Sequence, residues 1–135
     1  MSSLASPDLR VAEGQLTKAE VNAGKQVIEA QAKRAITIVD AWVRAIGGAA
    51  ADNTSVDIQD TVTGTKVCIF TRAGLAQNAI LRAGTATTGV SANLNKSLGT
   101  GEGVKILNVG TAVDTLTHLD YVILYKVEAV DQVSA

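Results

Sequence analysis

The stretch LDYVILYKVE at residues 119–128 decides the fold class, because its side chains follow a pattern with a period of two. In an extended chain the even-numbered residues share one side, namely Asp120, Val122, Leu124, Lys126 and Glu128. The odd-numbered residues on the other side include Tyr121, Ile123, Tyr125 and Val127. This pattern, in a stretch rich in β-branched and aromatic residues, predicts a β-strand.

Four further stretches have the composition of short strands. They lie at residues 55–60, 66–71, 79–83 and 104–109, and connections that hold Gly, Thr and Asn separate them. Short strands alternating with such connections are typical of a β-sandwich or barrel. We therefore predict mostly antiparallel strands after residue 51. The positions expected to face inward include Val56, Ile58, Val122 and Leu124.

Residues 16–48 fit two interpretations. Apolar residues at spacings of three and four, from Val21 to Ile46, together with a high alanine content, favour a helix that ends at Gly47. The same segment also divides into two strands at 25–30 and 35–46, and the second is dense in β-branched residues. Propensity alone leaves both interpretations open.

Residues 1–15 are predicted to form an extended N-terminal arm, and residues 16–135 a single β-sandwich domain. The arm begins with small and polar residues, contains Pro7, and has no regular periodicity. The arm also contains three apolar residues, Leu4, Leu9 and Val11, and a solvated linker would not need this apolar content. We expect these three residues to order on a partner surface, as segments that fold on binding do.

Composition bounds the partners that the chain can have. The 135 residues carry a formal net charge of −1, which gives no electrostatic reason to expect nucleic acid. No apolar run approaches the length of a transmembrane helix, so we expect no membrane partner. The N-terminus lacks the pattern of a secretory signal. The single cysteine excludes an internal disulfide.

The sequence offers few groups for catalysis, and we predict that the chain is not an enzyme. His118 is the only histidine, so a metal-binding cupin-like site would lack its ligands. Cys68 lies among apolar strand residues and is expected to be a buried structural thiol. The glycine-rich stretch at 99–103 precedes a strand instead of a helix, which argues against a phosphate-binding loop.

The acidic residues near residue 55 also lack a known ligand pattern. The spacing of Asp52, Asn53, Asp57 and Asp60 does not match a calcium loop. The sequence therefore predicts no catalytic residue, no cofactor and no metal.

The chain contains, in this order, distinctive segments at 22–28, 36–48, 54–58 and 77–84, GEGV at 101–104, and a last segment at 118–122. In style and order these segments resemble the small capsid decoration (cement) proteins of tailed bacteriophages. The resemblance covers about residues 20–128 and implies a β-sandwich or jelly-roll fold, with strands over 25–46. It also implies a structural virion protein that binds the major capsid protein on the outer capsid surface, forms homo-oligomers and is made in the host cytoplasm. It assigns no functional residue.

The alternative is a receptor- or glycan-binding β-sandwich domain of a phage fibre or adhesin. Such domains bind sugars on exposed aromatic side chains, and only four aromatic residues occur: Trp42, Phe70, Tyr121 and Tyr125. Apolar neighbours on both sides favour a core position for Trp42.

Overall fold

The computed structural model describes residues 8–47, 55–71, 78–84, 90–110 and 116–128, which form two antiparallel sheets. The four-stranded sheet has the order β1 (Asp8–Thr17), β9 (His118–Val127), β3 (Ile36–Ile46) and β6 (Ile80–Arg82). The five-stranded sheet has the order β2 (Lys25–Ile28), β8 (Val104–Val109), β4 (Ser55–Asp60), β5 (Lys66–Thr71) and β7 (Val90–Ala92).

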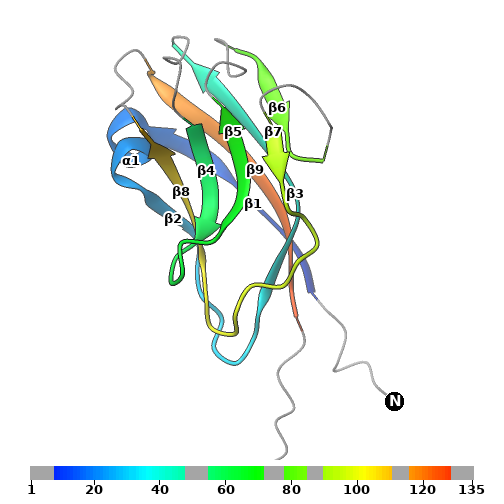
Figure 1. Ribbon diagram of the computed structural model, residues 1–135. Coiled ribbons are helices and arrows are strands. Elements are labelled where there is room, and N and C mark those ends of the chain that lie inside the picture. Colours follow the sequence, from blue (N-terminus) through cyan, green and yellow to red (C-terminus); the bar gives the residue numbers. More distant parts are fainter. Residues whose placement is uncertain (1–7, 48–54, 72–77, 85–89, 111–115, 129–135) are drawn as a thin grey trace, which may run out of the picture.

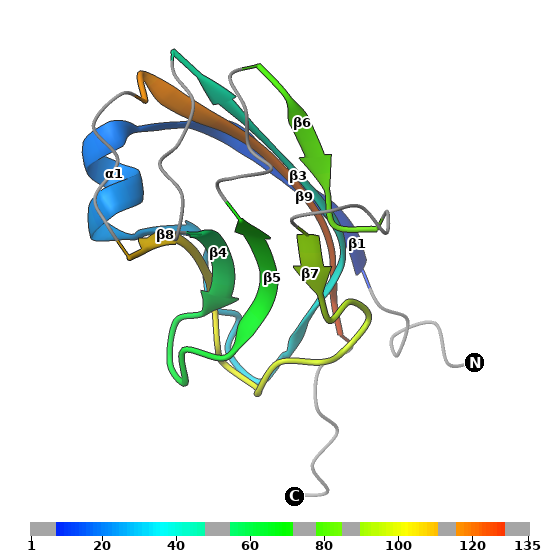
Figure 2. The same cartoon turned by 45° about the horizontal axis from the view of Figure 1, so that its top comes forward.

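The sheets form two layers around one core, so the prediction of a mostly β, antiparallel β-sandwich is confirmed (Figures 1 and 2). The four-stranded sheet arches over the five-stranded sheet in Figure 2, and helix α1 (Lys18–Ala23) lies at one side. No helix in the described part of the chain is long and apolar enough to cross a membrane.

The ambiguity over residues 16–48 is resolved mainly in favour of strands, with one short helix before them. A capping box starts α1: the Thr17 hydroxyl accepts a hydrogen bond from the Glu20 amide at 3.2 Å, and the Glu20 carboxylate accepts one from the Thr17 amide at 3.0 Å. The latter bond is the main cause that lowers the pKa of Glu20. Gly24, at φ 90°, ends the helix and leads into β2.

The expected boundary between arm and domain is wrong within the described residues. Residues 8–15 do not precede the sandwich but form most of β1, which pairs with β9 from Asp8↔Val127 to Thr17↔His118. The inward side of β1 includes Ala12 and Leu16, which pack on the core. Residues 1–7, and Leu4 with them, lie outside the described residues.

The core lies between the two sheets and confirms half of the predicted inward positions. Val56 and Ile58 are buried from β4. Val122 and Leu124 are not part of the core, because β9 turns its odd-numbered side inward and buries Leu119, Ile123 and Val127 completely. The reason is charge: the even-numbered side also carries Asp120, Lys126 and Glu128, and burying unpaired charges is costly.

A bulge changes which side of β3 faces the core. Ile38 pairs with Tyr125 and Asp40 with Leu124, so β3 has one extra residue, Val39, between positions that pair with consecutive residues of β9. Before the bulge the even-numbered Ile36 and Ile38 are buried; after it the odd-numbered residues are buried, namely Ala41, Val43 and Ala45. The next even-numbered residues therefore face away from the core.

The assignment of inner and outer sides predicts that two isoleucines of the four-stranded sheet contribute very differently to the free energy of unfolding. Ile123 is 0% exposed and Ile80 is 61% exposed. We expect Ile123→Ala to lower the free energy of unfolding by about 2–5 kcal/mol, because it removes buried surface and leaves a cavity. Ile80→Ala should change it by less than about 0.5 kcal/mol. Urea unfolding measures both values, and equal losses would contradict the assignment.

Candidate functional site

Apolar side chains gather on the side of the four-stranded sheet that faces away from the core. Residues directly opposite each other on paired strands point to the same side. Val11 pairs with Leu124, and Val122 pairs with both Glu13 and Trp42. Ile80 continues this side onto β6, opposite Arg44. We call this surface the outer face; its apolar members are Leu9, Val11, Trp42, Ile80, Val122 and Leu124.

The outer face leaves much of this apolar surface in contact with solvent. Leu9 is 61% exposed, Val11 57% and Ile80 61%, and the other three members are partly exposed. Two of the three arm residues predicted to bind a partner thus lie on this face, Val11 opposite Leu124 and Leu9 opposite Lys126. Contiguous exposed apolar surface of this kind commonly marks a protein–protein contact.

A hollow of about 390 Å³ lies on the outer face where β3, β6 and β9 adjoin. Its lining comprises Trp42, Val43, Arg44, Ile80, Asp120, Tyr121 and Val122. Arg44 and Asp120 form an ion pair at its side, with Nη2 of the arginine 2.9 Å from Oδ2 of the aspartate. The hollow therefore combines an apolar floor with one pair of charged groups.

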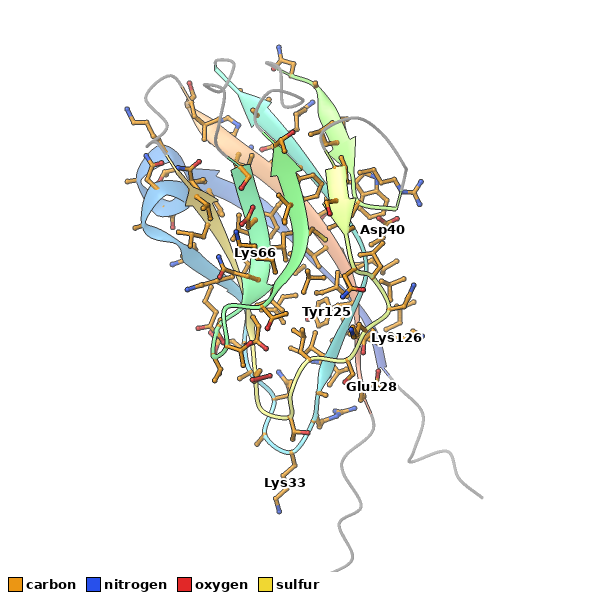
Figure 3. The ribbon with its side chains drawn as sticks, in the orientation of Figure 1. Lys33, Asp40, Lys66, Tyr125, Lys126 and Glu128 are labelled. Atoms are coloured by element: carbon orange, nitrogen blue, oxygen red, sulfur yellow. The ribbon has the colours of Figure 1, made fainter. Side chains whose placement is uncertain are left out.

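Trp42 lies on the outer face and not in the core, contrary to the sequence prediction. The guanidinium of Arg82 lies over its ring, 5.0 Å from the ring centroid. Asp40 fixes this arginine, since its Oδ2 accepts a hydrogen bond from Nε of Arg82 at 2.7 Å. Its Oδ1 accepts further bonds from the amides of Ala41 and Gly84, both at 2.8 Å. Figure 3 labels Asp40.

His118 lies close to Asp120, as their spacing along one side of a strand allows. Nε2 of His118 is 3.4 Å from Oδ1 of Asp120, while Oδ2 of the same carboxylate binds Arg44. Within the described ranges no hydroxyl or thiol is hydrogen-bonded to His118. The pair thus has a carboxylate and an imidazole in contact, without a nucleophile at hydrogen-bond distance in this part of the chain.

Cys68 is a buried thiol, as its sequence context predicts. Burial, with a smaller contribution from the charge of Asp40, raises the pKa of Cys68 to about 12. The thiolate is the reactive form of cysteine, so this environment makes the residue inert at neutral pH.

The two described acidic residues of the 52–60 cluster have structural partners. Asp57 is fully buried; its Oδ2 is 3.0 Å from Nζ of Lys66, and its Oδ1 accepts a hydrogen bond from the Ser55 hydroxyl at 2.6 Å. Oδ1 of Asp60 accepts hydrogen bonds from the amides of Val62 and Thr63 in the turn after β4. Asp52 and Asn53 lie outside the described residues.

No group of three or more His, Cys, Asp or Glu residues that could hold a metal ion occurs where the chain is described. The glycine-rich stretch at 99–103 leads into β8, so no helix follows it. Gly101 has φ 79°, in line with the expected tight connection. A hydrogen bond with Asp60 is the main cause that raises the pKa of Glu102 in this connection.

A second, polar hollow of about 480 Å³ lies between the start of β3, the end of β9 and the connection before β8. Its side chains include Lys33, Lys126 and Glu128. Oε1 of Glu128 accepts a hydrogen bond from the Thr37 hydroxyl at 2.8 Å. Lys33 extends away from the body of the molecule in Figure 3, so its ammonium group does not converge with Lys126.

The environment of Cys68 predicts its reactivity. With a pKa of about 12, only about one thiol in ten thousand is ionised at about pH 8. We expect iodoacetamide to leave the native protein unmodified and to alkylate it fully in denaturant, as mass spectrometry would measure. Val62→Cys, at a position that is 69% exposed, is the positive control. Alkylation of native Cys68 at the rate of the control would contradict this interpretation.

Comparison with models of protein families finds no match for the chain. Neither the curated proteins nor the solved structures contain a significant match. The function is therefore inferred from the residues and geometry of the chain itself.

Proposed function

We propose that the chain is a structural virion protein that binds the outer surface of a phage capsid and stabilises it, with the outer face as its contact surface. In this proposal the partner is the major capsid protein, the chain acts as a homo-oligomer, and it is made in the host cytoplasm. The observation that carries the proposal is the exposed apolar surface of the outer face.

The order of the strands supports a jelly-roll fold within this proposal. Apart from β7, the strands form nested antiparallel pairs: β1 with β9, β2 with β8, β3 with β6, and β4 with β5. A jelly roll is a double-sheet arrangement of eight strands that is found in viral capsid and lectin domains. The nested pairing is what a long hairpin produces when it is rolled into two sheets.

The side chains of the outer face suit a contact with a protein. Trp, Arg and other large side chains carry most of the binding energy in protein interfaces. Trp42 lies here beside two arginines, Arg44 and Arg82, and each arginine is held by an aspartate. Because these ion pairs already hold the charged groups in position, less side-chain entropy is lost on binding.

A glycan- or receptor-binding domain is the second candidate. The observation in its favour is Trp42 on a solvent-facing sheet surface, with the donor and acceptor groups of Arg44 and Asp120 beside it. A sugar would stack on the indole ring, however, and Arg82 covers one side of that ring. Protein docking uses the arginine in its observed place, whereas sugar stacking on that side requires its displacement, so the first proposal is preferred.

Capsid binding tests the proposal. We expect Trp42→Ala and Leu124→Lys each to weaken binding of the full chain to expanded capsids of the phage that encodes it by at least about thirtyfold, the loss typical of a central interface residue. Val62→Lys, at an exposed position away from the outer face, should bind like the wild type. Co-sedimentation measures binding, and circular dichroism confirms that each variant is folded.

Two results would contradict the proposal. One is that wild-type protein does not bind the capsids. The other is that both outer-face variants bind them as tightly as Val62→Lys does. Binding of wild-type protein to a glycan array, abolished by Trp42→Ala and strengthened by Arg82→Ala, would instead support the second candidate.

A further inference from the structure

The four sheet edges in the described part of the chain differ in how well they are protected. An edge strand presents unpaired backbone groups, and proteins usually shorten, bend or charge such strands to prevent pairing with another chain. Strands β6 and β7 have three residues each, and β2 has four residues and an irregular register. Three of the four edges are thus short, and one of these is also irregular.

The fourth edge, β1, is neither short nor irregular. It is ten residues long and pairs with β9 through ten consecutive residues without a register shift. Its sequence, DLRVAEGQLT, contains neither proline nor lysine, and its charged residues are Asp8, Arg10 and Glu13. No described strand pairs with its other edge. Leu9 and Val11 stand exposed on this strand. A long, regular edge strand that exposes apolar side chains is a template for another strand.

We propose that a second copy of this chain pairs through this edge, so that the two β1 strands run antiparallel around a twofold axis at Val11. Identical strands can pair in this way because an antiparallel arrangement of two copies is self-complementary. The two four-stranded sheets then join into one continuous sheet across the dimer.

The side chains of β1 select the register. In an antiparallel pair, opposite residues must point to the same side, so the centre of symmetry falls on a residue. Centring the pair on Arg10 would place two arginines opposite each other, which is unfavourable. Centring it on Ala12 would set Val11 against Glu13 and Leu9 against Gln15, so no two apolar residues of the outer face would be opposite each other. Centring it on Val11 sets Leu9 against Glu13, but it places the two valines opposite each other, with Leu9 of each copy diagonal to the partner's Val11.

This register also completes the outer face. Val11 of each copy lies beside its own Leu124, and the pairing therefore joins the two apolar surfaces into one. It covers part of Leu9 and Val11, which a single copy leaves 61% and 57% exposed. The inference does not depend on capsid binding, since it concerns an edge of the sheet and a second copy of the same chain.

A cysteine at the centre of symmetry tests both the pairing and its register. Opposite Cα atoms in antiparallel strands are about 4.5–5.5 Å apart, which is within the range that a disulfide spans. We expect the full chain carrying Val11→Cys to form a covalent dimer under mild oxidation. Val62→Cys, in the turn after β4 at a position that is 69% exposed against 57% for Val11, should stay monomeric on non-reducing gels. Native Cys68 is buried and does not compete.

Sedimentation without any capsid provides the second measurement. The wild type should be a dimer at concentrations where Val11→Lys, which would set two lysines opposite each other, dissociates at least about tenfold more readily. Trp42→Ala should remain dimeric, because it changes the outer face and not the edge. A dimer that Val11→Lys does not weaken, a wild-type monomer, or cross-linking of Val62→Cys to the same extent as Val11→Cys would overturn the proposal.

Pairing of β1 with a strand of a different protein is also distinguishable. In that case the chain would be monomeric alone, and Val11→Cys would form no covalent dimer. A dimer that fails to bind capsids would leave the inference standing and reject the proposed function.

Discussion

The pairing of β9 with β1 on one side and with β3 on the other is the constraint on which the rest of the structure depends. It joins residues near both ends of the described chain to residues 36–46. Leu119, Ile123 and Val127 are completely buried in this register. A slip by one residue would turn Asp120, Lys126 and Glu128 inward, so the pattern of β9 strongly disfavours any other pairing.

The same constraint creates the outer face. Once the odd-numbered side of β9 is buried, Val122 and Leu124 must face solvent beside Val11 and Trp42. The ion pair of Arg44 with Asp120 contributes little to folding, because both side chains are partly exposed, 44% and 24%. The carboxylate of Asp40 is buried, so its bond to Arg82 is also part of the folded structure. Both pairs hold an arginine at a fixed place next to an apolar surface.

Most of the strands could be predicted from the sequence because their own residues carry a period of two. This holds for 55–60 and 104–109, where Val56, Ile58, Val104 and Ile106 are buried. The strand at 66–71 is predicted instead by its apolar run of residues that favour strands. Strand β1 was missed because its inward side includes the small residues Ala12 and Gly14. The partner strand fills that space: a Cβ on Gly14 would lie 3.1 Å from the Tyr121 hydroxyl. Because Tyr121 of the neighbouring strand fills the space beside β1, the inward residues of β1 can be small, and its sequence then shows no alternating hydrophobic pattern.

Trp42 shows why the candidate site could not be predicted in the same way. In an unbroken strand Trp42 would share the side of Ile36 and Ile38, and the core position expected from its apolar neighbours would follow. The bulge before Asp40 reverses this side. Asp40 can occupy the bulge because two backbone amides and Arg82 satisfy its carboxylate. One of these amides comes from Gly84, 44 residues away, and such a partner is not visible in local sequence. The group that holds the bulge also fixes the arginine over Trp42, so the irregularity of the strand and the composition of the outer face have one cause.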